Sequence, residues 1–244
     1  MKSGTLYGIG IGPGDPELIT LKGARLISAC RNLFVPKAQT AAESVALAIA
    51  RPLVGPEAKI EELLFPMTAD RDELVRHWDA AAARVAAVLE EGEDACFLSL
   101  GDPLLYSTYI YLLRALRKRM PDLRAITVPG ITAFGAAAAL TDFPLGEGRE
   151  TVTIVPAVDD LAGVRRVIAA GGTVVLMKIG KRLPEIIDLL DGEGLLESSV
   201  FVSHATMPEQ RVETDLRRLA TEGPEAGYLS ILLVHAGEKG GKRR

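Results

Sequence analysis

The chain contains 244 residues, of which 48% are hydrophobic and 25% charged, and its formal net charge is −4 at pH 7. This composition is typical of a globular protein, and the length is sufficient for two lobes with separate cores. The acidic balance argues against a general affinity for nucleic acid or an anionic membrane, and no apolar run reaches the ~20 residues of a membrane span.

Five short apolar segments in the first half alternate with helical patterns. We expect strands at 5–11, 33–35, 60–65, 95–100 and 125–128, and helices at 21–30, 41–50, 70–91 and 108–120. Thr20 is a plausible N-cap of the first helix. The strands are apolar throughout, which is typical of a parallel sheet covered by helices on both faces.

The second half repeats the alternation after a loop at 142–149. Strands are expected at 152–155, 173–177, 200–203 and 229–234, and helices at 161–169 and 184–190. We therefore predict two lobes, one of residues 1–129 and one of residues 130–244. Cys30 and Cys96 lie in apolar segments, and residues 1–6 do not resemble a secretory signal, so we expect reduced, buried thiols in a cytoplasmic protein.

A glycine-rich segment, Gly8-Ile-Gly-Ile-Gly-Pro-Gly-Asp-Pro16, follows the first strand. Pro13 stands where a dinucleotide-binding turn would continue into its helix, and no Gly-Lys-Ser/Thr follows to make a P-loop. The segment is therefore a rigid turn, either in a ligand site or purely structural.

Two further turns follow the fourth and fifth strands, Gly101-Asp-Pro-Leu-Leu-Tyr-Ser-Thr108 and Pro129-Gly-Ile-Thr-Ala-Phe134. Asp102 could bind ligand hydroxyl or amine groups, or it could cap the next helix in place of Ser107 or Thr108. Thr132 has the same two alternatives. Because the carboxyl ends of parallel strands share one edge, the three turns predict a small-molecule cleft there.

Together these segments resemble the tetrapyrrole (corrin/porphyrin) methylase family over residues 5–237. The resemblance implies a kinked, dimer-forming subunit of two α/β lobes, the first with a five-stranded, mainly parallel sheet and the second with a mixed sheet. It also implies that S-adenosylmethionine is bound in a cleft between the lobes and released as S-adenosylhomocysteine. The cofactor contacts implied are Pro13, Leu100, Gly101, Asp102, Leu105, Thr132, Ala133, Met177 and Ala205, the last of which is often glycine in the family.

The segments at 65–70, 106–112, 144–148 and 228–234, together with Trp78, resemble the branch that methylates C20 of precorrin-2, with or without cobalt. That carbon is electron-rich, so a strong protein base is not required. Tyr106, Tyr109 and His204 are candidate proton acceptors, although packing or hydrogen bonding is the alternative for each. Among cations near strand ends, we prefer Lys37 and Lys178 as partners of the substrate carboxylates.

No Cys, His and acidic spacing suggests a metal bound by the protein, so any cobalt would arrive within the substrate. We expect a small-molecule tetrapyrrole and a second copy of the chain as partners, and neither nucleic acid nor membrane. The alternatives are methylation of another corrin carbon or of uroporphyrinogen III, 2′-O-methylation of ribosomal RNA on the same fold, and non-catalytic tetrapyrrole transport.

Overall fold

The computed structural model describes residues 3–38, 43–157, 161–222 and 227–237. The chain forms two compact units, Met1–Thr132 and Ala133–Arg244. The division between them falls three residues after the predicted boundary. Part of the helix predicted at 41–50 lies outside the described residues, and the helix observed there begins at Val45.

The first unit is built on a five-stranded sheet in the order β3-β2-β4-β1-β5. All four strand pairs are parallel, which confirms the predicted sheet. The strands are β1 (Thr5–Gly10), β2 (Asn32–Lys37), β3 (Lys59–Leu64), β4 (Ala95–Ser99) and β5 (Arg124–Val128).

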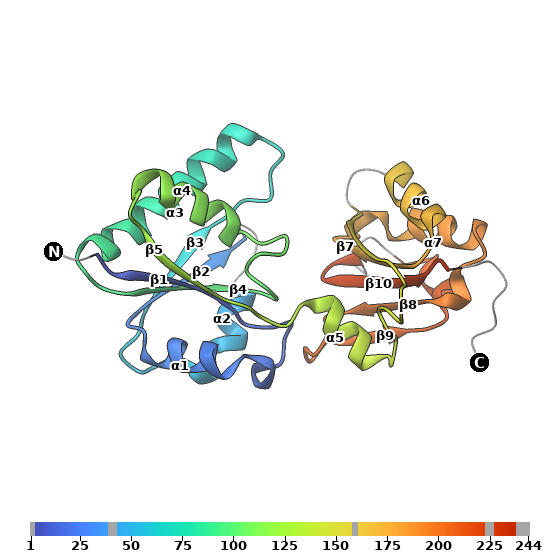
Figure 1. The fold of residues 1–244 in the computed structure, drawn as a ribbon, viewed down its shortest axis with the longest axis horizontal. Coiled ribbons are helices and arrows are strands. Elements are labelled where there is room, and N and C mark those ends of the chain that lie inside the picture. Colours follow the sequence, from blue (N-terminus) through green and yellow to red (C-terminus); the bar gives the residue numbers. More distant parts are fainter. Residues whose placement is uncertain (1–2, 39–42, 158–160, 223–226, 238–244) are drawn as a thin grey trace. The chain divides into compact units, whose positions relative to one another are not determined.

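Helices cover both faces of this sheet (Figure 1). One face carries α1 (Leu21–Ala29) and α2 (Val45–Ala50), and the other carries α3 (Arg71–Glu90) and α4 (Tyr109–Arg119). Helices α1, α2 and α3 begin at side-chain caps, and in α1 the Thr20 hydroxyl accepts from Gly23 N at 3.1 Å, as predicted. Short 3₁₀ helices occupy Pro16–Leu18 and Arg51–Leu53.

The core beneath α3 and α4 contains a tyrosine that the sequence pattern placed near the ligand. Tyr109 is fully buried beside Phe97, with ring centroids 6.0 Å apart, and its hydroxyl lies 3.2 Å from Thr127 Oγ1. Gly8 in β1 lies directly under this ring, because a Cβ atom there would be 2.1 Å from Tyr109 Cζ. The glycine therefore makes the space that the buried tyrosine fills.

The second unit contains a mixed sheet in the order β6-β7-β10-β8-β9, also as predicted. Strands β6 and β7 are parallel, whereas β10 is antiparallel to both β7 and β8. The strands are β6 (Val152–Pro156), β7 (Thr173–Met177), β8 (Ser199–Ser203), β9 (Arg211–Glu213) and β10 (Ser230–His235). The short edge strand β9 was not predicted, because three residues give no periodicity.

Alternate strand residues of the second sheet face two separate cores. Val174, Leu176 and Phe201 pack with α6 (Leu161–Ala170) and α7 (Leu183–Gly192), while residues of the opposite face pack on α5 (Ala133–Leu140). This arrangement explains why the strands read as continuous apolar runs. Short 3₁₀ helices in the described part of this unit include Gly180–Arg182, Leu196–Ser198 and Leu216–Leu219.

The structure also bears on the predicted lack of a membrane-spanning segment and on the state of the two cysteines. None of the described helices is both long and apolar enough to cross a bilayer. Cys30 and Cys96 are buried free thiols, as the sequence predicted.

The close approach of Gly8 and Tyr109 predicts a strong stability effect. Gly8→Ala should lower the free energy of unfolding of the first unit by about 1–3 kcal/mol or more, because the new methyl group overpacks the core. The matched control is Gly192→Ala, where an added Cβ meets no heavy atom within 4 Å. Urea denaturation of both variants checks this; equal midpoints would contradict it.

Candidate functional site

The carboxyl ends of β1, β4 and β5 meet at one edge of the first sheet, because β1 lies between the other two and parallel to them. The segments remain in contact beyond the strands. Ile11 N donates to Ser99 O at 3.0 Å, and Gly101 N donates to Gly12 O at 2.8 Å. The structure therefore brings together the predicted turns.

Three glycines allow the turns to approach within backbone contact. A Cβ atom on Gly10 would lie 2.5 Å from Gly130 N, and one on Gly130 would lie 2.2 Å from Gly101 O. No side chain fits at these contacts, so only backbone atoms line the junction. Gly101 also has a φ of +67°, a left-handed conformation that favours glycine.

Asp102 joins two of the turns. Its Oδ1 accepts from Leu104 N at 2.8 Å and its Oδ2 accepts from Gly130 N at 3.0 Å. Helix α4 begins only at Tyr109, so the predicted alternative that Asp102 caps this helix is wrong. The Thr108 side chain makes no capping bond, and the Ser107 hydroxyl donates to the Pro103 carbonyl instead. Asp102 thus fixes the relative positions of two loops at the sheet edge.

The turn after β1 is also fixed by its own side chains. Gly12 has a φ of +74°, Pro13 is buried, and Asp15 Oδ1 accepts from Glu17 N at 2.8 Å. These local bonds lead into α1, whose first turn Thr20 caps. The geometry of the turn is therefore set before any ligand binds.

An apolar rim surrounds this edge. Leu104, Tyr106 and Ile131 are 58%, 38% and 38% exposed, although all three are large and hydrophobic or aromatic. Tyr106 has a φ of +49°, which costs a non-glycine residue about 1–3 kcal/mol. Exposed apolar side chains on a strained loop are typical of a binding site.

A second cluster of strained residues lies at one edge of the second sheet. Lys178 follows β7, His204 follows β8 and Leu229 precedes β10, and their φ values are +53°, +48° and +45°. These positions are neighbours because Met177 pairs with Ile231 and Ser203 with Ser230. These positive φ values could not be predicted from the residue types, since glycine is the residue expected at such angles.

Several contacts hold the strained edge together. His204 N donates to Leu229 O at 3.0 Å, and the His204 ring lies 6.0 Å from that of Tyr228. Ala205 is 5% exposed, and Thr206, with a φ of +65°, has its N–H bonded to Gln210 Oε1 at 2.8 Å. Four of the six non-glycine residues with positive φ in the described chain thus gather here.

The sequence-predicted site residues fall into two groups. The first unit holds the residues of the turns after β1, β4 and β5. The second unit holds Ala133, at the start of α5, and the residues at or after the ends of β7 and β8. Within its own unit, each group lies beside strand ends at one sheet edge. The groups are Pro13, Leu100, Gly101, Asp102, Leu105, Tyr106 and Thr132 in the first unit, and Ala133, Met177, Lys178, His204 and Ala205 in the second.

Tyr109 and Lys37 are placed differently from expectation. Burial raises the pKa of the Tyr109 hydroxyl, so this residue is a neutral part of the core. Its fully buried ring lies out of reach of a substrate, and we do not propose it as a proton acceptor. Lys37 Nζ lies 2.6 Å from Glu62 Oε2, and this bond lowers the pKa of Glu62. The Lys37 ammonium is therefore already partly neutralised within the protein.

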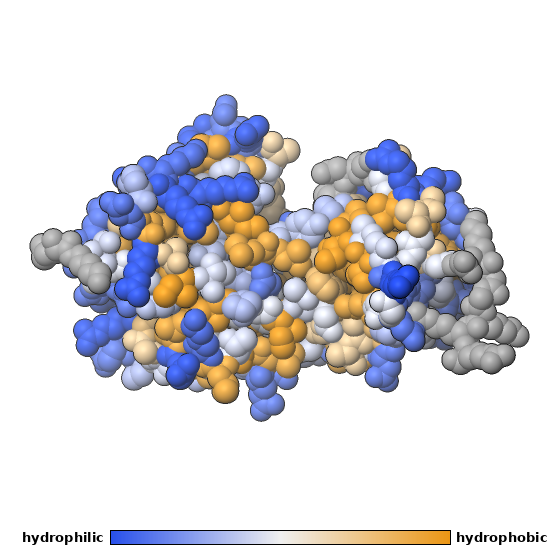
Figure 2. Space-filling view, in the orientation of Figure 1, coloured by the Kyte–Doolittle hydropathy of each residue, from blue (hydrophilic) through white to orange (hydrophobic). Residues whose placement is uncertain are grey.

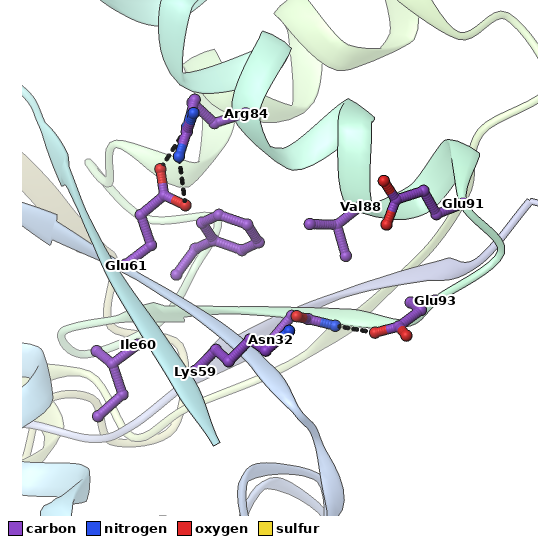
Figure 3. A pocket seen from close by; sticks show the side chains of 9 residues that line it. Asn32, Lys59, Ile60, Glu61, Arg84, Val88, Glu91 and Glu93 are labelled. Carbon is purple, nitrogen blue, oxygen red and sulfur yellow. Dashed lines mark hydrogen bonds and ion pairs between the residues drawn. The ribbon is translucent and has the colours of Figure 1, made fainter. Parts of the chain in front are cut away.

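A pocket of about 390 Å³ lies at the opposite edge of the first sheet (Figure 3). Asn32 and Lys59 begin β2 and β3, and Val88 and Glu91 end α3. Within it, Arg84 Nε lies 2.7 Å from Glu61 Oε1, and Asn32 Nδ2 donates to Glu93 Oε2 at 2.8 Å. This hollow is remote from the converging turns, since it lies at the amino ends of the strands, so we do not assign the function to it. No cluster of potential metal ligands occurs among the described residues.

Comparisons with known proteins identify a family and relatives that match most of the chain. Residues 5–220 match the family described as Tetrapyrrole (Corrin/Porphyrin) Methylases. The chain is 34% identical to the cobalt-precorrin-2 C(20)-methyltransferase of Salmonella typhimurium, covering 96% of this chain and 97% of that one. It is 32% identical to the precorrin-2 C(20)-methyltransferase of a Sinorhizobium species, over 95% of each chain.

A solved structure shares the fold. The uroporphyrin-III C-methyl transferase of Thermus thermophilus, complexed with S-adenosylhomocysteine, superposes with a TM-score of 0.65 at 21% identity. The alignment covers 96% of this chain and 98% of that one. This similarity shows that the two-unit α/β architecture is common to both proteins.

The two bonds of Asp102 predict a measurable effect. Asp102→Ala should cost about 1–3 kcal/mol of stability, because the N–H groups of Leu104 and Gly130 lose their partner. It should also raise the hydrogen-exchange rate of the Gly130 amide. Asp122→Ala is the control, since that exposed carboxylate accepts no hydrogen bond from any described residue. Unchanged exchange at Gly130 would show that Asp102 does not hold the loop.

Proposed function

Because the chain belongs to the tetrapyrrole (corrin/porphyrin) methylase family, we propose that it transfers a methyl group from S-adenosylmethionine to C20 of precorrin-2 or cobalt-precorrin-2. The reaction belongs to the biosynthesis of cobalamin. The observation that carries the proposal is the backbone-lined junction at Gly10, Gly101 and Gly130.

The residues at the two sheet edges suit this cofactor. S-adenosylmethionine is a flexible cation with amino, carboxylate, hydroxyl and adenine groups, which backbone N–H and C=O groups can bind without bulky side chains. In the first unit we propose contacts from Pro13, Leu100, Gly101, Asp102 and Leu105. Thr132 completes that set, and the second unit contributes Ala133, Met177 and Ala205.

When bound, the cofactor supplies an electrophilic methyl group on a sulfonium, so the protein mainly positions groups and excludes water. Asp102 holds Leu104 and Gly130 in place, and the Gly12–Gly101 bridge fixes the turn after β1. The rim of Leu104, Tyr106 and Ile131 excludes water from this edge. The strained loops keep these groups preorganised.

A proton must leave C20 after methyl transfer, and two residues remain candidates to accept it. Tyr106 is exposed on the strained loop of the first unit, and His204 lies at the strained edge of the second. Both stand at positive φ, which aims their side chains in directions that ordinary loop geometry does not give. We assign substrate carboxylates to Lys37 and Lys178, and we propose a cytoplasmic homodimer on the basis of the family resemblance.

Labelled methyl transfer tests the proposed activity. Anaerobic incubation with S-adenosylmethionine carrying a ¹³C methyl group and precorrin-2 should give product labelled at C20 and one equivalent of S-adenosylhomocysteine. Label at another carbon would indicate a sibling reaction, and binding without transfer would indicate a carrier. Label in ribosomal RNA would overturn the substrate class. The ratio of kcat/KM for precorrin-2 and cobalt-precorrin-2 identifies the metal state.

Variants of Lys37 and Glu62 test whether Lys37 binds the substrate or only supports Glu62. If Lys37 binds a carboxylate, Lys37→Ala should raise the tetrapyrrole KM about tenfold and leave the S-adenosylhomocysteine Kd unchanged. Adding Glu62→Gln should not restore the KM. Recovery in the double variant would instead show that the loss came from leaving Glu62 without its partner. Lys118→Ala, on the last turn of α4, is the control.

A further inference from the structure

A stacked aromatic pair with one exposed partner lies on two helices that begin at the carboxyl edge of the first sheet. Helix α3 connects the carboxyl end of β3 to the amino end of β4, and α4 connects β4 to β5 in the same way. Since all these strands are parallel, both helices begin at the edge that carries the Asp102 turn. Arg71 and Tyr111 belong to the first turns of α3 and α4, so they lie on the side of the unit where ligands bind.

Trp78 of α3 stacks on Tyr111 of α4, with ring centroids 4.3 Å apart and an interplanar angle of 6°. Trp78 is half-buried, whereas Tyr111 and Val75 are 40% and 39% exposed. Val75 lies three residues before Trp78 and so shares its helix face. We call Val75, Trp78 and Tyr111 the aromatic platform.

The platform is exposed among charged residues. Figure 2 shows hydrophobic residues between hydrophilic ones over α3 and α4. Met67, which follows the carboxyl end of β3, is 79% exposed. A rigid, parallel aromatic stack that keeps one partner exposed is poised to contact a flat apolar ligand.

Two arginines flank the platform. Arg71 lies four residues before Val75 and Arg114 three residues after Tyr111, so each shares a helix face with a platform residue. Neither guanidinium forms an ion pair within the described ranges, in contrast to Arg84 farther along α3, which binds Glu61. Unpaired guanidinium groups are suited to bidentate binding of carboxylates.

We propose that the aromatic platform binds one face of the tetrapyrrole, with substrate carboxylates on Arg71 and Arg114. This inference rests on the proposed function, and it adds a specificity-determining surface to it. A planar conjugated ring with anionic arms matches an aromatic stack between two cations in both shape and charge. Stacking there fixes the orientation of the macrocycle and hence the carbon presented for methylation.

Kinetics of platform variants test the contact. In the double variant Trp78→Ala/Tyr111→Ala, the KM for precorrin-2 should rise about tenfold. The Kd for S-adenosylhomocysteine should stay within about twofold of wild type, because neither ring belongs to the proposed cofactor contacts. Trp78→Phe/Tyr111→Phe, which keeps stacked rings, should restore most of the affinity. If the double alanine variant fails to fold, the KM is measured for Tyr111→Ala alone, since Tyr111 is the exposed partner, and it should still rise.

The arginines are tested separately. Arg71→Gln and Arg114→Gln should each raise the KM several-fold and reduce its salt dependence, whereas Arg117→Gln should not, because Arg117 lies in the last turn of α4. Equal behaviour of the three variants would overturn the assignment of carboxylates.

The chain's single tryptophan, Trp78, supplies a readout without turnover. Titrating precorrin-2 into protein saturated with S-adenosylhomocysteine should quench its emission, and Tyr111→Ala should weaken the resulting Kd in step with the KM. If wild-type protein methylates precorrin-2 but the platform variants keep its KM and Kd, the platform proposal fails and the proposed function stands. If wild type neither binds nor methylates precorrin-2, both fail. Sedimentation showing that the variants alter self-association, with the KM unchanged, would assign the platform to a second copy.

Discussion

The contact of three backbones at Gly10, Gly101 and Gly130 is the constraint on which the rest of the first unit depends. These glycines lie at the carboxyl ends of β1, β4 and β5, and a methyl group on Gly10 or Gly130 would push the three segments apart. Because they touch, the strand ends present peptide groups rather than side chains. Asp102 stabilises the same junction by bonding two loops, so the edge is rigid before any ligand binds.

The edge of the second sheet is also preorganised, but by non-glycine residues in strained conformations. Instead of glycine, it places Lys178, His204, Thr206 and Leu229 in left-handed conformations beside the ends of β7 and β8. Each such residue carries a conformational cost, which the surrounding sheet must offset. A chain with a net charge of −4 would bind a polycarboxylate through cations at particular positions rather than across its surface, and we propose Arg71 and Arg114 for that role.

Apolar periodicity and glycine- and proline-bearing turns, which are local signals, predicted the parallel sheet and the convergence of turns, whereas the mixed sheet was implied by the family resemblance. The sequence could not predict β9, whose three residues have no period, or the left-handed angles at His204 and Leu229, which depend on tertiary contacts. Tyr109 was a candidate acceptor because of its position after the Asp102 turn, yet the space beneath it comes from Gly8, a hundred residues away in the chain. Lys37 likewise pairs with Glu62 across neighbouring strands, a contact no local pattern indicates.

We propose that backbone groups at these sheet edges bind a sulfonium cofactor. Amide hydrogen exchange can be measured by mass spectrometry with and without saturating S-adenosylhomocysteine. We expect slower exchange in peptides containing Gly12, Gly101 and Gly130 of the first unit and Lys178 and His204 of the second. Protection confined to the amino-edge pocket around Asn32 and Lys59, or no protection at either sheet edge, would contradict it.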